Sequence, residues 1–314
     1  MNEPDTVILF GAGASYGAGH IQPEAPPLGE GLYEALATHY PNEWGSQSQL
    51  EKWADKFRDD FEQTMSNEVL PRLPPLCLLE WHRPVALFFA KYRLDGSGRD
   101  LYSRLLAKLK TRGLLERVTL GSLNYDCLLE QAMAELGLST DYMLDDAHPA
   151  GSIPLAKIHG SSNFVTADLS SSWQALLTRP GSSVESPFTA LPIAGLEDAL
   201  LRKFSTYNPA VFPVLGMYSQ NKPSIVAQAK LYKLRNILEQ KIIGAKALML
   251  IGLRPTPGRD LHLWDPVERS TASKIGYIGG TDDYVILKNR QVRAIHLAET
   301  FEEGFTGIPS ILSS

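Results

Sequence analysis

The sequence predicts an α/β protein with a Rossmann-like, mostly parallel, doubly wound sheet that carries helical insertions. Short apolar runs of strand length alternate with longer segments of helical pattern, which is typical of this class. Three polar clusters also follow directly on such runs, as ligand-binding segments do at the carboxyl ends of parallel strands. The predicted strands lie at 6–10, 117–120, 153–158, 245–252 and 291–297.

The segments between these strands predict helices and two insertions. Apolar side chains recur at helical spacing through much of 30–115, and again at 126–136 and about 225–238. Residues 166–241 are otherwise irregular, with a serine-rich stretch and several prolines, and we interpret them as an insertion that covers one edge of the site. We therefore expect a single domain over 1–314, with helical insertions at about 30–115 and 166–241.

Composition excludes several classes of protein. The 314 residues are 44% hydrophobic and 21% charged, and a net charge of −5 does not indicate a nucleic-acid-binding surface. Cys77 and Cys127, the two cysteines, are too few for a four-thiolate zinc site or a disulfide framework. No apolar stretch approaches a membrane span, and residues 1–5 lack the features of a signal peptide. We expect a cytoplasmic protein with no membrane partner and no direct nucleic-acid partner.

The three polar clusters are expected to meet at one ligand. They are Gly11-Ala-Gly-Ala-Ser15, Ser122-Leu-Asn-Tyr-Asp126 and Lys157-Ile-His-Gly-Ser161. In an open parallel sheet, the carboxyl ends of the strands border a single crevice. A phosphate-binding glycine turn, an Asn/Asp pair and a histidine would then surround one nucleotide.

The glycine cluster is open to more than one interpretation. Glycines at 11, 13 and 17 allow the backbone to approach a pyrophosphate closely, although the spacing departs from the usual dinucleotide fingerprint by one residue. No strand ending in Asp or Glu follows about twenty residues later, which disfavours a hydride-transfer enzyme. Gly13-Ala-Ser15-Tyr-Gly17 also matches a nucleophile elbow, but it follows the first strand, where a serine hydrolase does not normally carry it.

The second and third clusters supply polar side chains suited to catalysis. Asn124 can hold a ribose hydroxyl or a water, while Asp126 lies where it can cap the next helix. His159 directly ends a predicted strand and is the candidate general base. The other six histidines form no recognisable metal-ligand spacing, and no metal site is predicted.

In this order, the motifs resemble the sirtuin superfamily, and most closely its zinc-free bacterial branch of NAD-cleaving antiphage defence proteins. The resemblance covers roughly residues 6–300 and rests on four motifs: Gly11–Ser15, Leu123-Asn-Tyr-Asp126, Ile158-His-Gly-Ser161 and the late Leu250-Ile-Gly252. It implies a Rossmann core that binds NAD in an extended crevice.

The resemblance also implies roles for individual residues. Asn124 would orient the nicotinamide ribose or the attacking water, His159 would be the base, and Gly252 would pass close to the adenosine side. The remaining cofactor-binding residues that it implies are Gly11, Ala12, Gly13, Ala14, Ser15, Ser122 and Asp126.

The departures from the family pattern weigh against a deacylase. Ser122-Leu123 replaces the Thr-Gln pair that deacylating sirtuins carry before Asn124, and their Phe-Arg pair after the glycine loop is missing. Their four-cysteine zinc module is absent as well, so no zinc is expected.

We therefore expect an NAD glycohydrolase that cleaves NAD+, its substrate, to nicotinamide and ADP-ribose, as a bacterial antiphage effector. The alternatives are a non-catalytic NAD or ADP-ribose sensor and an NAD-dependent protein deacylase. The resemblance further implies a homo-oligomer and a separate sensor or ATPase as partner. The sequence does not identify the trigger or the products beyond nicotinamide.

Overall fold

The structure of the chain is a computed structural model that describes residues 6–145, 148–179, 181–205, 210–216, 222 and 224–312. Residues 1–5, to which the signal-peptide prediction refers, lie outside the described residues, as do parts of the predicted insertion at 166–241.

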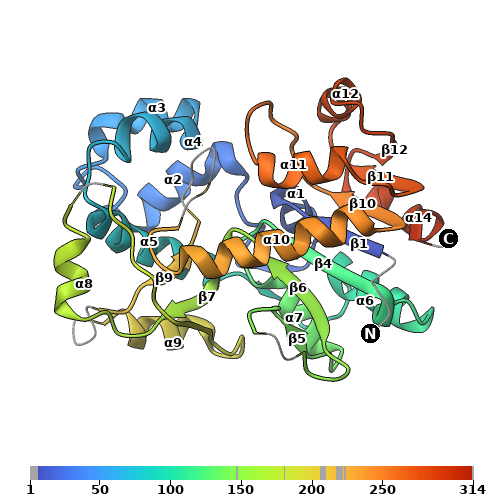
Figure 1. Cartoon of the computed structure of the whole chain (residues 1–314), viewed down its shortest axis with the longest axis horizontal. Helices are drawn as coiled ribbons and strands as arrows, with labels where there is room; N and C mark the ends of the chain where they lie inside the picture. The colour runs from blue at the N-terminus through green and yellow to red at the C-terminus, as the bar shows by residue number, and fades with distance from the viewer. Residues whose placement is uncertain are drawn as a thin grey trace.

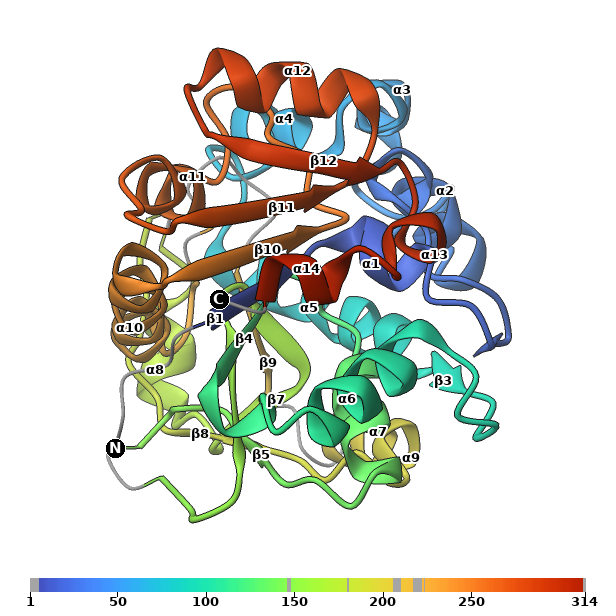
Figure 2. The ribbon, with the colours of Figure 1, turned by 90° about the vertical axis from the view of Figure 1, so that its right-hand side faces the viewer.

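Seven parallel strands form the central sheet, in the order β12–β11–β10–β1–β4–β6–β5. Figure 2 shows β10, β11 and β12 side by side, with α12 beyond β12. The predicted fold class, a parallel α/β sheet of Rossmann type, is confirmed. The strands are β1 (Thr6–Phe10), β4 (Val118–Ser122), β5 (Thr140–Asp141), β6 (Ile153–Lys157), β10 (Ala247–Ile251), β11 (Lys274–Ile278) and β12 (Ala294–Ala298).

Strand β1 shows how the sheet divides two hydrophobic cores. All five of its residues are buried, because helices cover both faces of a parallel sheet. Successive side chains in a strand point to opposite faces. Ile8 and Phe10 accordingly belong to one core, and Val7 and Leu9 to the other.

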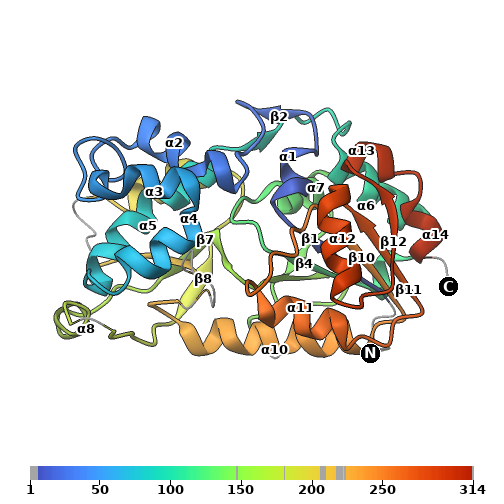
Figure 3. The same cartoon turned by 90° about the horizontal axis from the view of Figure 1, so that it is seen from above.

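The larger core joins the N-terminal helices to one face of the sheet. In Figure 3, α2 to α5 lie at one end of the molecule and the parallel strands at the other. Besides α10 (Gln228–Gly244), which contributes only Leu231, the α-helices with buried residues in this core are α1 (Ala12–Tyr16), α2 (Gly29–His39), α3 (Ala54–Asp59), α4 (Phe61–Thr64), α5 (Pro75–Ala90), α6 (Leu101–Thr111), α7 (Leu128–Glu135), α9 (Leu196–Lys203), α13 (Phe301–Gly304) and α14 (Ile308–Leu312).

Three helices pack on the opposite face. They are α10 (Gln228–Gly244), α11 (Leu261–Glu268) and α12 (Thr281–Asn289). The long α10 runs across the molecule in Figure 1, and its Leu234, Leu238 and Ile242 face the second core at helical spacing. No helix in the described part of the chain has the length and apolar character that crossing a membrane requires.

The insertions contain more than the predicted helices. A three-stranded antiparallel sheet, with the order β8–β7–β9, occupies part of 160–215. The remaining elements are β7 (Gly160–Thr166), β8 (Phe188–Ala190), β9 (Pro213–Leu215), β2 (Ile21–Gln22), β3 (Arg93–Leu94), α8 (Ser171–Leu176), the 3-10 helices η1 (Glu51–Trp53) and η3 (Leu115–Arg117), and the π-helical turn η2 (Met65–Val69).

Candidate active site

The predicted polar clusters follow neighbouring strands of the central sheet. Gly11–Ser15 follows β1, Asn124 follows β4 and His159 follows β6, and these three strands are adjacent. Gly252 follows β10, on the other side of β1. The structure therefore brings all the predicted site residues to one edge of the sheet.

The glycine segment packs directly on Gly252. The Gly11 amide donates to the carbonyl of Ile251 at 2.9 Å, and the Gly13 amide donates to that of Gly252 at 3.0 Å. Gly252 has a φ of +64°, and a Cβ there would lie 2.0 Å from the Ala14 nitrogen. Only glycine fits at this close contact between the two backbone segments.

The chain after the predicted glycine turn is helical. Residues Ala12–Tyr16 form the short helix α1, because the Gly17 amide bonds back to the carbonyl of Gly13 at 3.0 Å. Ala12 is exposed, whereas Ala14 and Ser15 are buried. Ala14 therefore belongs to the hydrophobic core, and its side chain is unavailable to a ligand.

Asn124 connects the second cluster to the first. Its side-chain nitrogen donates to the carbonyl of Gly11 and to the Ser15 hydroxyl, both at 2.9 Å. Ser15 also contacts the Tyr102 hydroxyl at 2.9 Å, and among the described residues no histidine bonds to its Oγ. The serine-hydrolase interpretation of this glycine segment lacks its base, because Ser15 pairs with an amide and a phenol.

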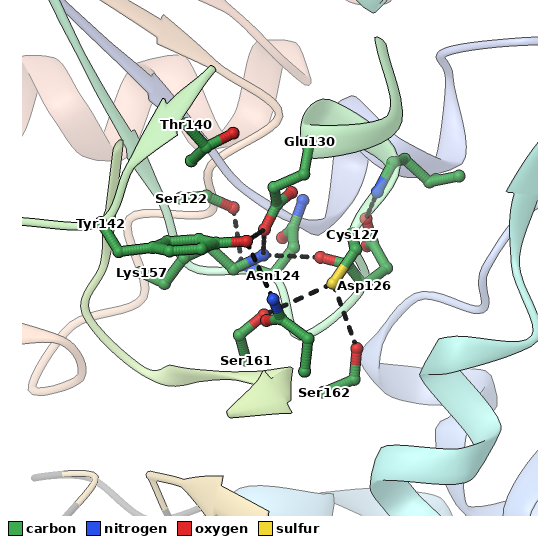
Figure 4. A network of polar contacts seen from close by, with 12 residues as sticks. Ser122, Asn124, Asp126, Cys127, Glu130, Thr140, Tyr142, Lys157, Ser161 and Ser162 are labelled. Carbon is green, nitrogen blue, oxygen red and sulfur yellow. Dashed lines mark hydrogen bonds and ion pairs between the residues drawn. The ribbon is translucent and has the colours of Figure 1, made fainter. Parts of the chain in front are cut away.

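A buried polar network lies beneath the Asn124 turn (Figure 4). The Lys157 ammonium donates to the Asp126 carbonyl at 2.5 Å and forms an ion pair with Glu130 at 3.2 Å. The Asp126 carboxylate accepts from the Leu128 amide at 3.1 Å, as expected for a residue at the start of α7. Ser122 Oγ accepts from the Asn124 amide at 3.1 Å. The network fixes the backbone that carries Asn124.

Cys127 belongs to this network and is inert. Its sulfur lies 3.6 Å from Ser161 Oγ and 3.4 Å from Ser162 Oγ (Figure 4). Burial, together with the Glu130 carboxylate, raises the pKa of the Cys127 thiol to about 12. The thiolate that nucleophilic chemistry requires is therefore not formed near neutral pH.

His159 lies next to the Asn124 turn but is closed to solvent. The ring hydrogen-bonds to the main-chain carbonyl of Leu123. Its Nε2 lies 2.9 Å from Nε2 of His262 and 3.4 Å from Oδ1 of Asp260. The side chain is 4% exposed. Burial, followed by the positive charge of Lys222, holds the pKa of His159 well below its usual value.

Asp260 and His262 are functional candidates that the sequence predictions missed. Both lie where α11 begins, nine and eleven residues beyond the end of β10. They follow no strand directly. The criterion that identified Asn124 and His159, a polar residue directly after a predicted strand, therefore does not identify them. The one signal is the Asp260-x-His262 pair itself, which follows the glycine and proline turn at 255–258.

The donor atoms of His159, Asp260 and His262 lie within 4.8 Å of one another, a set that could hold a metal ion. The ring centroids of His159 and His262 are 5.1 Å apart, so the two nitrogens meet head-on at 2.9 Å. Ligands of one tetrahedral zinc, bound at about 2.0–2.1 Å, stand about 3.3 Å apart and converge at an angle. The geometry fits an N–H···N hydrogen bond rather than a zinc site.

His262 also lines a pocket of about 370 Å³ between α10 and α11. Tyr232, Arg235 and Asn236 border it from α10, and Leu261 and Asp265 border it from α11. His262 thus stands between the buried His159 and this pocket.

Comparisons with known proteins show Sir2 enzymes among the similar structures. No family model matches the sequence, and no curated protein shows significant sequence similarity. A Sir2 homologue in complex with NAD has a TM-score of 0.48 and 14% identity, over 98% of this chain and 90% of that one. A mutant Sir2 homologue with ADP-ribose has a TM-score of 0.47 and 12% identity, with the same coverage. A Sir2 enzyme bound to a propionylated peptide has a TM-score of 0.45 and 14% identity, over 98% and 91%. At these values the likeness carries no argument about chemistry, so function is inferred from the chain's own residues.

Proposed function

We propose that this protein is an NAD glycohydrolase of the zinc-free, sirtuin-like type, which cleaves NAD+ to nicotinamide and ADP-ribose. The observation that supports it is the meeting of the glycine segment, Asn124 and His159 at the carboxyl ends of three adjacent strands. The sequence resemblance adds the role in antiphage defence, the homo-oligomer and the sensor or ATPase partner to this proposal.

In the proposed reaction, the nicotinamide–ribose bond breaks and positive charge develops on the ribose, as in glycoside hydrolysis. The glycine segment holds the pyrophosphate, since residues without side chains let a phosphate approach the backbone; Gly13 itself packs so closely on Gly252 that a Cβ on Gly13 would lie 2.9 Å from the Gly252 Cα. Asn124 orients the ribose or the water, and His159 receives the proton of the attacking water. A base of this kind contributes about 10²- to 10⁴-fold to the rate.

A binding module without catalysis is the second candidate. The observation that favours it is the burial of His159, whose Nε2 faces His262 instead of an open crevice. A sensor would bind NAD or ADP-ribose through the same glycine segment and would need no base.

The deciding experiment measures nicotinamide released from NAD+ by the purified protein, with calorimetric binding of NAD+ alongside. We expect His159→Ala and Asn124→Ala each to lower the rate of nicotinamide release by about 10²-fold or more. Circular dichroism should show that both variants remain folded. The matched control is His148→Ala, because His148 is paired with Asp141 at 2.6 Å and is not one of the predicted site residues.

The outcomes separate the two candidates. Release that survives in both site variants overturns the assignment of Asn124 and His159. Binding of NAD+ without release by the wild type, tested also in assembled form, identifies the sensor. Release that requires an acyl-lysine peptide identifies the deacylase.

A further inference from the structure

Both N–H groups of the Asn124 side chain are engaged within the protein. Its Nδ2 donates to the Gly11 carbonyl and to Ser15 Oγ, each at 2.9 Å. A carbonyl can only accept, so the contact with Gly11 fixes which atom of the carboxamide is the nitrogen. The Asn124 Oδ1 bonds to no described residue, and it is left to accept from a ribose hydroxyl or a water. The orientation of Asn124 therefore depends on what holds Gly11 and Ser15.

Ser15 is the movable member of this group. The Gly11 backbone is fixed by a hydrogen bond from its amide to the Ile251 carbonyl at 2.9 Å, whereas the Ser15 hydroxyl can rotate about its Cα–Cβ bond. A serine within a helix can bond the carbonyl four residues earlier. For Ser15 of α1, that carbonyl belongs to Gly11 and is the acceptor that Asn124 uses. A Ser15 that turned this way would leave Asn124 without one partner and compete for the other.

The Tyr102 hydroxyl holds Ser15 in its observed position. The two oxygens lie 2.9 Å apart, so Ser15 Oγ is bonded by both Tyr102 and Asn124. Ser15 and Tyr102 are both buried. Burial, followed by the Asp126 carboxylate, raises the pKa of Tyr102 well above its usual value. The phenol therefore stays neutral, and it contributes a hydrogen bond to the site and no charge.

Helix α6 fixes the position of Tyr102. The residue lies in the first turn of this helix, which the Asp100 side chain caps. The Leu101 amide donates to the Ala18 carbonyl at 2.8 Å, which joins the start of α6 to the chain just after α1. The Tyr102 ring packs edge-to-face with Phe10 of β1, with the ring centroids 5.4 Å apart. The phenol is thus anchored to the strand and to the segment that flank Ser15.

We propose that Tyr102 is a positioning residue of this site, which holds Ser15 so that Asn124 presents its carboxamide oxygen to the substrate. This inference rests on the proposed function. Tyr102 acts only through Ser15 and Asn124. No sequence pattern indicated it, because it follows no strand and lies 87 residues from Ser15.

The variant Tyr102→Phe tests this role, because it removes the phenol oxygen and keeps the ring. We expect the kcat of nicotinamide release to fall by about 10- to 10²-fold, as a small misplacement of a site group does. The KM for NAD+ should change little, since the orientation of Asn124 matters in the transition state. A folded Tyr102→Phe variant with the wild-type kcat, or one that changes KM alone, overturns the proposal.

The matched control is Tyr284→Phe. The Tyr284 hydroxyl also forms a hydrogen bond, to the Ala294 carbonyl at 3.0 Å, and its ring stacks on His296. None of these three residues is among those predicted for the site. The control should keep the wild-type kcat, and circular dichroism should show that both variants are folded. An equal loss of kcat in the control would overturn the proposal, because removal of an unrelated tyrosine hydroxyl would then have the same effect.

A measurement without substrate tests the hydrogen bonds themselves. In protein labelled with ¹⁵N at asparagine, we expect both Nδ2 protons of Asn124 to be protected from exchange with solvent. Their signals are the ones that disappear in Asn124→Ala. Tyr102→Phe and Ser15→Ala should each let one of the two protons exchange faster, whereas Tyr284→Phe should not.

This measurement also separates the positioning role from the proposed hydrolase. Unchanged protection in Tyr102→Phe overturns the positioning role whatever the activity, and so does a wild type in which only one of the two protons is protected. If the protection changes as expected but the wild-type protein releases no nicotinamide, the hydrogen bonds stand and the hydrolase is overturned instead.

Discussion

At the scale of single residues, His82 makes the stability of the protein depend on pH. It lies buried in α5, and neither ring nitrogen has a hydrogen-bond partner among the described residues. Burial lowers the pKa of His82 to about 4. An unfolded histidine titrates near 6.5, so between these values the unfolded chain binds more protons and stability falls as the pH falls.

As the pH falls from 6.5 to 4, we expect the titration of His82 to lower the free energy of unfolding by about 3 kcal/mol. A pKa difference of about 2.5 units between the folded and unfolded states corresponds to that amount. Urea unfolding of wild type and His82→Leu over this range measures it. The variant should lose less stability on acidification, whereas the exposed control His148→Leu should behave as wild type. Equal acid sensitivity of His82→Leu and wild type would show that His82 is not the group that titrates.

The same scale shows which site residues a sequence can reveal. Asn124 and His159 were found because each comes directly after an apolar run, and parallel strands gather such positions at one edge. Asp260 and His262 are brought to His159 by a turn of nine residues after β10. No periodic pattern in the sequence predicts the path of this turn. The burial of His159 also depends on that turn, and the sequence therefore suggested an open base where the structure encloses it.

At the scale of elements, a buried ion pair joins α7 to the central sheet. Glu130 of α7 and Lys157 of β6 lie 3.2 Å apart, and each side chain is 1% exposed. Oε2 of Glu130 has no hydrogen-bond partner among the described residues, and burial raises the pKa of this carboxyl. Removing one partner leaves the other buried without compensation.

We expect Lys157→Met to lower the free energy of unfolding by about 3–5 kcal/mol, and the double variant Glu130→Leu/Lys157→Met to recover most of that loss. A double-mutant cycle in urea measures the coupling. A double variant as unstable as the sum of the single ones would mean that the two charges do not stabilise each other.

Elements also differ in how far sequence predicts them. The buried strands β1, β4, β6 and β10 lie in mostly apolar segments and were predicted to within two residues. The strand β11 was missed, because Lys274-Ile-Gly-Tyr-Ile278 begins with a charge and holds a glycine. The glycine fits there because a Cβ at Gly276 would lie 2.8 Å from Met249. The short strands β8 and β9 pair only with the distant β7, and such non-local pairing leaves little local pattern.

Residues 50–61, within the region 30–115 that was predicted to be helical, show a different limit. Their apolar side chains are buried as expected, yet the segment is divided into η1, α3 and α4. Asp60 interrupts it with extended backbone, and its side chain accepts from the Gln63 amide to cap α4. Spacing of apolar residues identifies the buried face, whereas a cap within the segment decides where the helix breaks.

At the scale of the whole molecule, the single-domain organisation remains a proposal with a physical basis in the cores. The larger core contains residues of both predicted insertions together with Ile8 and Phe10 of β1, so the insertions and the sheet share buried contacts. The second core lies on the other face of the same strands. Loss of either core exposes one face of the sheet to water. The stability of each core therefore depends on the other.

We therefore expect one cooperative unfolding transition for the insertions and the sheet together. Of the five tryptophans, Trp264 alone lies in the second core, and the others fall within the two insertions, so the fluorescence of Trp264→Phe reports the insertions only. Far-UV circular dichroism of the same variant reports all the helices and strands. The two urea midpoints should coincide, because opening the insertions exposes Ile8 and Phe10 to water. A fluorescence transition at clearly lower urea would instead show that the insertions unfold first, as a separate domain would.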